Sequence, residues 1–350
     1  MPKFLKKKQF WGGLVAVGIM AFLFYDLDIP RTVEVAEQLR LIYLIPILAC
    51  ATGLIVFKTW RWMTIVSKVK KVLFWPTLAL YSTAQVIAVL LPALTGQAGR
   101  VLLFSRKGDF SKTYAFSTIF LEIVLDGAGL IILMMLSSSV FVFPEEYRFV
   151  SYIIGGATIF VLILFYCSLH FQSRMEGFGY RRIRPRSPKV YLIIKKFLRS
   201  FNDGISVIKS TDKLFVISLN TFLAWGCHVG AVFFLFYLFN FDLPIWAAVV
   251  VIIVNYLALM IPITPGNLGS FQLAVVASLN VFSIPKTEAV LFSILLYIVD
   301  MLPMVILAAF FVFKENFSIS EISEDEELIA EVENIVADGG IEITDGVEEK

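Results

Sequence analysis

The chain alternates between long apolar blocks and short polar connections. A helix needs about 20 apolar residues to cross the roughly 30 Å hydrocarbon layer of a membrane, whereas a soluble helix shows only one apolar stripe. The pattern therefore predicts an all-α fold, a polytopic membrane helix bundle. Nine blocks fit this description: residues 10–25, 41–57, 72–95, 113–139, 149–171, 214–241, 244–262, 266–283 and 287–313.

The charges between the blocks predict which ends lie in the cytoplasm, because lysine and arginine accumulate in cytoplasmic loops. Four lysines precede residue 9, and the connection 172–213 holds 11 bases against three acids. We therefore expect the N-terminus and this loop on the cytoplasmic side of the cell (inner) membrane. The last block would then return the C-terminus to the same side.

Two parts of the chain break the alternation of sides. The block 72–95 has basic residues at both ends, and only a short break, PITPGNLG, separates 244–262 from 266–283. Both observations are explained if the chain enters the membrane, turns and leaves on the same side, which is tolerated where protein or water covers the backbone. We predict two inverted re-entrant hairpins, about residues 72–110 and 244–283, among six full crossings. Eight or more crossings result if either hairpin passes through.

The two predicted turns share one motif, P-x-x-x-G-(Q/N)-x-G. Its fixed positions are Pro92, Gly96, Gln97 and Gly99 in the first turn, and Pro262, Gly266, Asn267 and Gly269 in the second, where Pro265 precedes the glycine. Proline ends one half-helix and glycine turns the backbone, so the next half-helix starts with free amide donors and a positive dipole end. Inverted pairs of interrupted helices mark binding sites near the middle of the membrane, which makes these residues candidates for binding a phosphate group. The alternative is two tight turns between spans.

Charged residues inside the blocks complete the candidate site. Glu122 and Asp126 lie four residues apart and share one helix face, and Arg100 follows the first turn. A charge at membrane depth costs at least about 2.5 kcal/mol, so such residues are paired or functional. We expect these three side chains to form one cluster, in which Arg100 binds a lipid phosphate and the surplus acid takes a proton or a cationic group. The alternative is a structural ion-pair cluster that pins the hairpin to the span.

Other polar residues in or beside the blocks have two interpretations each. Asp300 is alone in the last block and is a lipid-binding candidate by default, although Tyr297 and water could hold it. Gln272 either hydrogen-bonds a headgroup or satisfies the broken backbone of the second turn. His228 is expected to join helices by hydrogen bonds. Arg61, between two tryptophans, is expected to extend to the membrane surface.

Composition supports a membrane protein and divides the chain in two. Of the 350 residues, 58% are hydrophobic and 17% are charged, while soluble domains contain about 25% charged residues. Residues 1–314 carry 29 bases and 15 acids, whereas 315–350 carry one base and 13 acids. We predict a transmembrane domain, 1–314, followed by an acidic cytoplasmic tail, 315–350, with too few apolar residues to fold by itself.

The segment 188–210 has apolar residues at spacings of three and four, with lysines and arginines between them. This pattern predicts an amphipathic helix on the inner leaflet, attracted by anionic lipids. A linker helix packed on the bundle is the alternative. Cys50, Cys167 and Cys227 lie in apolar blocks without a CxxC spacing, which favours small packing residues over metal ligands. We expect no cofactor, no metal and no nucleic-acid partner.

The segments LLPALTGQAGR, FLEIVLDGAGL and IPITPGNLGSFQLA resemble the lysylphosphatidylglycerol synthase transmembrane region, also called the flippase-like membrane family. Order and spacing hold across about residues 10–313. The matching positions are Pro92, Gly96, Arg100, Glu122, Asp126, Pro262, Pro265, Gly266 and Gly269. The departures are glutamine for glutamate at Gln97 and Gln272, apolar residues for arginine at Leu94 and Ile123, and asparagine for glycine at Asn267.

The resemblance implies a flippase-like protein that binds an anionic or polyprenyl-linked lipid headgroup and moves it between leaflets. Its partners would be membrane lipids. In bifunctional relatives a separate soluble domain carries the aminoacyl chemistry, and only the 36-residue acidic tail follows the last block here, so we expect a transporter rather than an enzyme. Two alternatives remain: a membrane subunit of a lipid-modifying aminoacyl- or glycosyltransferase system with a separate synthase, and a scaffold that recruits a soluble partner through the tail.

Overall fold

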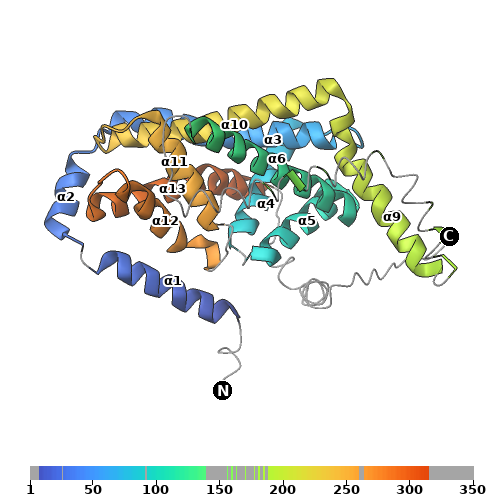
Figure 1. Cartoon of the computed structure of the whole chain (residues 1–350), viewed down its shortest axis with the longest axis horizontal. Helices are drawn as coiled ribbons and strands as arrows, with labels where there is room; N and C mark the ends of the chain where they lie inside the picture. Colours follow the sequence, from blue (N-terminus) through green and yellow to red (C-terminus); the bar gives the residue numbers. More distant parts are fainter. Residues whose placement is uncertain are drawn as a thin grey trace, which may run out of the picture.

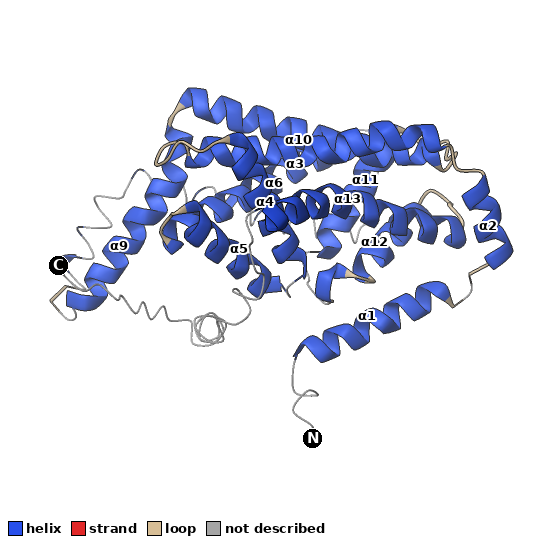
Figure 2. Cartoon of the chain, turned by 180° about the vertical axis from the view of Figure 1, so that it is seen from behind, coloured by secondary structure: helices blue, strands red, loops and turns tan. Residues whose placement is uncertain are grey.

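The computed structural model describes residues 8–25, 27–90, 93–138, 188–259 and 264–314, together with isolated positions between 156 and 185. All regular elements in these ranges are helices (Figure 2), which confirms the all-α bundle. The α-helices are α1 (Lys8–Phe24), α2 (Ile29–Glu37), α3 (Leu44–Val66), α4 (Phe74–Leu90), α5 (Ala93–Gly108), α6 (Lys112–Ser138), α9 (Pro188–Ile205), α10 (Thr211–Leu238), α11 (Ile245–Leu259), α12 (Ser270–Asn280) and α13 (Lys286–Lys314). Short 3-10 helices are η2 (Leu41–Tyr43), η3 (Ser206–Lys209) and η4 (Pro265–Asn267).

Four helical segments in the described part of the chain are long and apolar enough to cross a membrane: Leu41–Val66, Lys112–Ser137, Thr211–Leu238 and Lys286–Phe310. A fifth candidate combines α1 with α2 across an 84° bend, and in Figure 1 α1 lies along the outside of the bundle. The chain is therefore a multi-pass membrane protein. Only isolated positions of the predicted crossing at 149–171 are described, and the acidic tail 315–350 lies outside the described residues.

Helices α3 and α10 lie side by side along most of their length (Figures 1 and 2). A cysteine of each helix packs against a glycine of the other helix. A Cβ at Gly53 would lie 2.9 Å from Cys227 Sγ, and a Cβ at Gly230 would lie 3.1 Å from Cys50 Sγ. Small residues let two helices approach closely within a membrane. Both cysteines are free thiols, as their predicted packing role requires.

The two predicted hairpins correspond to α4–α5 and α11–α12. Their helices have 17, 16, 15 and 11 residues, all shorter than the roughly 20 residues of a full crossing. The second turn contacts the C-terminal end of α4, the first helix of the first hairpin. A Cβ at Gly266 would lie 3.8 Å from the carbonyl oxygen of Val89. The two hairpins therefore approach each other at their turns. Their re-entrant course and opposite orientation stay predictions.

The amphipathic segment forms α9, which is attached to the bundle at its C-terminal end. Phe201 packs at a tilt against Phe120 of α6, with ring centroids 6.3 Å apart, and Gly204 lies against Ser117. The N-terminal half extends away from the other helices (Figure 1) and exposes Leu192. The C-terminal end of α9 is thus packed on the bundle, as the linker interpretation expects. For the N-terminal half, binding to the membrane surface stays a prediction.

Replacing Lys195, Lys196 and Arg199 by glutamine should weaken binding of the peptide 188–210 to anionic liposomes. Each base near such a surface contributes about 1 kcal/mol, so the triple variant should lose most of its preference for anionic over neutral vesicles. A liposome co-sedimentation assay measures both. Equal binding of the unmodified peptide to neutral and anionic vesicles would remove the electrostatic part of the prediction.

Candidate functional site

Helix α3 continues nine residues beyond the apolar block 41–57 and brings two charged residues into the bundle. Lys58 and Arg61 interrupt the apolar run, but Ile55, Trp62 and Val66 continue its buried face. The Arg61 side chain is fully buried. The sequence-based expectation that Arg61 extends to the membrane surface is therefore wrong, because buried acids of α6 lie within its reach.

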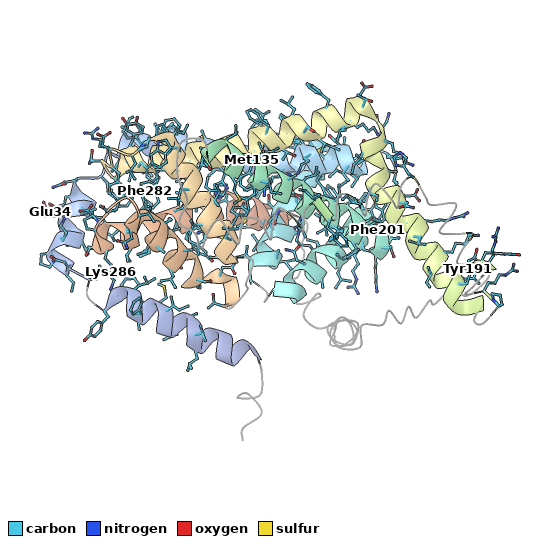
Figure 3. All side chains as sticks on the ribbon, in the orientation of Figure 1. Glu34, Met135, Tyr191, Phe201, Phe282 and Lys286 are labelled. Carbon is cyan, nitrogen blue, oxygen red and sulfur yellow. The ribbon has the colours of Figure 1, made fainter. Side chains whose placement is uncertain are left out.

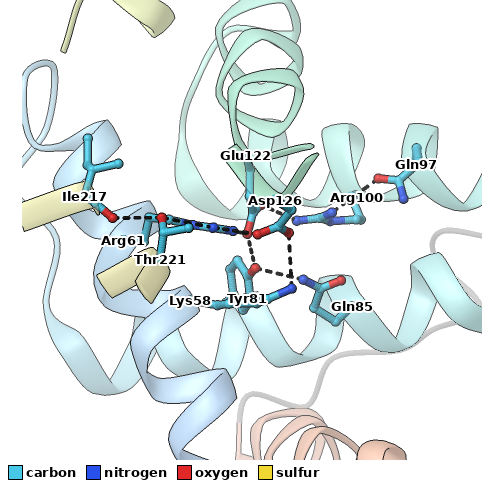
Figure 4. A network of polar contacts seen from close by, with 10 residues as sticks. All are labelled: Lys58, Arg61, Tyr81, Gln85, Gln97, Arg100, Glu122, Asp126, Ile217 and Thr221. Atoms are coloured by element: carbon cyan, nitrogen blue, oxygen red, sulfur yellow. Dashed lines mark hydrogen bonds and ion pairs between the residues drawn. The ribbon is translucent and has the colours of Figure 1, made fainter. Parts of the chain in front are cut away.

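The charged residues of α3, α5 and α6 form one network, the ion-pair cluster (Figure 4). Arg100 Nη2 lies 2.8 Å from Glu122 Oε2, and Arg61 Nη2 lies 3.1 Å from Glu122 Oε1. Arg61 Nη1 lies 2.6 Å from Asp126 Oδ1, and Lys58 Nζ lies 3.1 Å from Asp126 Oδ2. The structure thus brings together Arg100, Glu122 and Asp126, the three residues that the sequence placed in one cluster.

The charge balance of the ion-pair cluster is opposite to the one expected from the sequence. Among the described residues it contains three cations, Lys58, Arg61 and Arg100, and two carboxylates, Glu122 and Asp126. The surplus acid predicted from the sequence is therefore a surplus base. In addition, the Nε–H groups of Arg61 and Arg100 are buried and have no acceptor in the described part of the chain. The cluster combines a net positive charge with two unused hydrogen-bond donors.

Neutral polar side chains complete the network. Tyr81 Oη hydrogen-bonds Glu122 Oε1 and accepts a hydrogen bond from Gln85 Nε2 at 2.8 Å. On the other side, Arg100 Nη1 donates to Gln97 Oε1 at 3.2 Å. Gln97, which stands where the family pattern has glutamate, therefore holds the guanidinium without neutralising it. Tyr81 and Gln85 are not among the candidates expected from the sequence, where their four-residue spacing on α4 is the one signal for them.

The ion-pair cluster is shielded on most sides. The side chains of Arg61, Glu122 and Arg100 are 0%, 3% and 5% exposed, whereas those of Lys58 and Asp126 are 17% and 22% exposed. Access to the cluster is therefore from the Lys58–Asp126 side. A ligand entering there would meet Lys58 before the two guanidinium groups.

The second turn uses its special residues to satisfy its own backbone. Gly266, Asn267 and Gly269 have φ values of 63°, 56° and 85°, a left-handed conformation that glycine and asparagine tolerate best. Gln272 Oε1 accepts the N–H of Gly269 at 2.7 Å, and the Gly266 carbonyl accepts Tyr297 Oη at 2.8 Å. Of the two interpretations of Gln272, the structure thus shows backbone satisfaction. Among the remaining motif positions, Gly96 is buried in α5, Pro265 begins η4, and Pro92 and Pro262 lie outside the described residues.

Asp300 has a different partner from the one expected. Its Oδ2 lies 3.7 Å from His228 Nε2 across the α10–α13 interface, while Tyr297 bonds to Gly266. The rings of Trp225 and Tyr256 surround His228, with centroids 6.1 Å and 5.7 Å away. His228 and Asp300 therefore face each other between α10 and α13, but their separation is longer than a hydrogen bond, and the interhelical hydrogen bond expected of His228 stays a prediction. Asp300 is not among the residues of the hydrogen-bonded network in Figure 4.

The described residues contain no group of three or more histidine, cysteine, aspartate or glutamate side chains able to hold a metal ion. The charged groups of the ion-pair cluster instead suit an anion. The Nη groups of both guanidiniums already bond to protein side chains, so the donor that each arginine leaves for a ligand is its Nε–H. The surplus of one cation adds a net positive charge at the same place.

Comparison with known proteins agrees with the sequence motifs. The lysylphosphatidylglycerol synthase TM region matches residues 9–308. The UPF0104 membrane protein MJ1078 of Methanocaldococcus jannaschii is 24% identical over 229 residues, which cover 65% of this chain and 94% of that protein. No solved structure shows a significant match. Because the match spans the motifs of both hairpins and the cluster residues of α3 and α6, the chain belongs to the lysylphosphatidylglycerol synthase transmembrane-region family.

Proposed function

We propose that this protein binds the anionic headgroup of a membrane lipid, a phospholipid or a polyprenyl-linked lipid, in the ion-pair cluster and moves it between leaflets. The observation that carries the proposal is the surplus cation together with the two unused guanidinium donors. An anionic headgroup supplies the missing negative charge and the missing acceptors at once. The name of the family, which refers to a lipid, supports the same class of ligand.

The alternative, a purely structural cluster, explains these observations less well. A buried ion pair stabilises a fold only when its charges are balanced and its remaining donors are satisfied. An extra cation at membrane depth costs at least about 2.5 kcal/mol, and each buried donor without an acceptor costs about 1–3 kcal/mol more. A binding site tolerates such costs because the ligand offsets them.

Transport in proteoliposomes tests the proposal. Protein reconstituted with a fluorescent phosphatidylglycerol analogue should make inner-leaflet probe accessible to an external quencher faster than protein-free vesicles do. Arg100→Lys keeps the charge but removes the unused Nε–H donor, and it should slow this movement by at least about tenfold, the effect of losing one hydrogen bond to a charged group of about 1.5 kcal/mol. Arg31→Lys is the matched control, because Arg31 forms its ion pair with Glu288 at a half-exposed position, and it should transport as the wild type does.

Two results would count against the proposal. Equal quenching in vesicles with and without protein would favour a scaffold or a subunit of a lipid-modifying system. A wild-type rate of transport in the Arg100→Lys variant would instead show that transport does not depend on the ion-pair cluster. Elution of each variant as a single species in size-exclusion chromatography excludes misfolding as the cause of a loss.

A further inference from the structure

A second polar feature lies outside the ion-pair cluster, in an open groove of about 670 Å³ between α3 and α10. It occupies the end of the bundle where α3 finishes and α10 begins. The helices run antiparallel there with a constant register, since Arg61 contacts Thr221 and Ser67 contacts Lys213. This register gives the depth of each lining residue along the helix pair.

The groove has a charged end and an apolar end. Lys71, Asp212 and Lys213 line it at the level of Ser67, beyond the last turn of α3. Met63 and Val216 line it one turn deeper, and Trp60 lies one further turn into the bundle. Trp60 is 44% exposed, and tryptophan concentrates where the hydrocarbon of a membrane meets the headgroups. The groove therefore crosses the boundary between headgroups and acyl chains.

We propose that this groove docks one anionic phospholipid, with the headgroup phosphate between Lys71 and Lys213 and an acyl chain along Val216 and Trp60. Two lysines and one aspartate give the charged end a net positive charge, which complements a phosphodiester without a balancing amine. Lys213 Nζ donates to Ser67 Oγ at 3.0 Å. That bond uses one of three ammonium donors and fixes the lysine at the rim.

The apolar walls select a lipid rather than a soluble phosphate. The face of α10 next to the groove exposes Phe215, Leu219 and Phe222, so an acyl chain leaving the groove continues along an apolar surface. The groove is separate from the ion-pair cluster: Trp60 and Asn220 line it, whereas their neighbours Arg61 and Thr221 do not, since consecutive residues of a helix point about 100° apart. Docking here does not depend on translocation.

Photo-crosslinking of the full chain in nanodiscs tests the proposal. The crosslinker p-benzoylphenylalanine replaces Val216 in the groove or, as the reference, the lipid-facing Phe222 on the same helix. The nanodiscs contain phosphatidylcholine and phosphatidylglycerol, and intact mass spectrometry identifies the lipid in each adduct. At Val216 the phosphatidylglycerol share of adducts should exceed the share at Phe222. The double variant Lys71→Gln/Lys213→Gln should lower that enrichment by about fivefold for each lysine removed, which corresponds to about 1 kcal/mol per base.

Two further variants sharpen the result. Asp212→Asn should raise the enrichment, because it removes the acid at the charged end. Lys286→Gln should leave it unchanged, because Lys286 lies at the opposite end of the bundle from the start of α10 (Figures 1 and 3). Equal lipid shares at Val216 and Phe222, an enrichment that survives the double lysine variant, or adducts at Val216 to a second protein chain would overturn the proposal.

Discussion

Glu122→Gln should lower the free energy of unfolding by about 3–5 kcal/mol, the range for breaking a buried ion pair. Glu122 contacts Arg61, Arg100 and Tyr81 simultaneously. The substitution keeps the shape of the side chain but leaves one carboxylate, Asp126, to balance three cations. Thermal unfolding in detergent, followed by tryptophan fluorescence, measures the loss.

A matched control tests whether the loss of stability depends on the burial of the ion pair or follows from removing any ion pair. Glu34 pairs with Arg31 at 2.9 Å, but both side chains are largely exposed, so Glu34→Gln should change the stability by less than about 1 kcal/mol. The double variant Glu122→Gln/Arg100→Gln restores the original surplus of one cation and should recover part of the loss, as expected for coupled neighbours. Equal losses for Glu122→Gln and Glu34→Gln would contradict the buried geometry.

Gly129→Ala should destabilise the bundle by about 1–3 kcal/mol, the usual effect of overpacking a core. Gly129 lies in α6, about one turn after Asp126, and a Cβ there would collide with the indole of Trp225 on α10. Either α6 moves away from α10, which carries Asp126 with it, or Trp225 leaves its place beside His228. The variant should therefore lose transport as well as thermal stability.

Gly226→Ala is the control for Gly129→Ala. Gly226 follows Trp225 on the same helix, and a Cβ at Gly226 would meet no atom within 4 Å. Alanine is the better helix former by about 1 kcal/mol, so this variant should be as stable as the wild type or more stable. If both alanine variants behaved alike, the close packing of α6 on α10 would not be what limits position 129.

The sequence predicted the helices well because each membrane span is a continuous run of apolar residues, which can be recognised without knowing its neighbours in space. It also predicted the approach of Arg100, Glu122 and Asp126, since two acids one turn apart in a span need cations nearby. It missed Lys58 and Arg61 because charge ends an apolar run, although the helix continues. The sign of the surplus charge was wrong for the same reason: Arg61 balances the second acid and Lys58 adds the surplus cation, and both lie 61 to 68 residues before the acids that they pair with.

The second turn shows another limit of sequence reasoning. Its glycines predict a break in the helix, but they do not tell whether a ligand or the protein satisfies the freed amides. In the structure the amide N–H of Gly269 donates a hydrogen bond to the side chain of Gln272. For this reason we propose anion binding at the ion-pair cluster rather than at the turn, because the Nε donors of Arg61 and Arg100 remain unused within the described residues.

The central claim is that the ion-pair cluster binds an anionic lipid headgroup. Cryo-electron microscopy of the protein in nanodiscs rich in phosphatidylglycerol tests it most directly. Phosphate density should lie within hydrogen-bonding distance of the Arg61 and Arg100 guanidinium groups, reached from the side of Lys58 and Asp126, and it should be absent in nanodiscs of phosphatidylcholine alone. A cluster in anionic nanodiscs that contains only its own side chains and water, with both Nε donors bonded to protein or water, would contradict the claim.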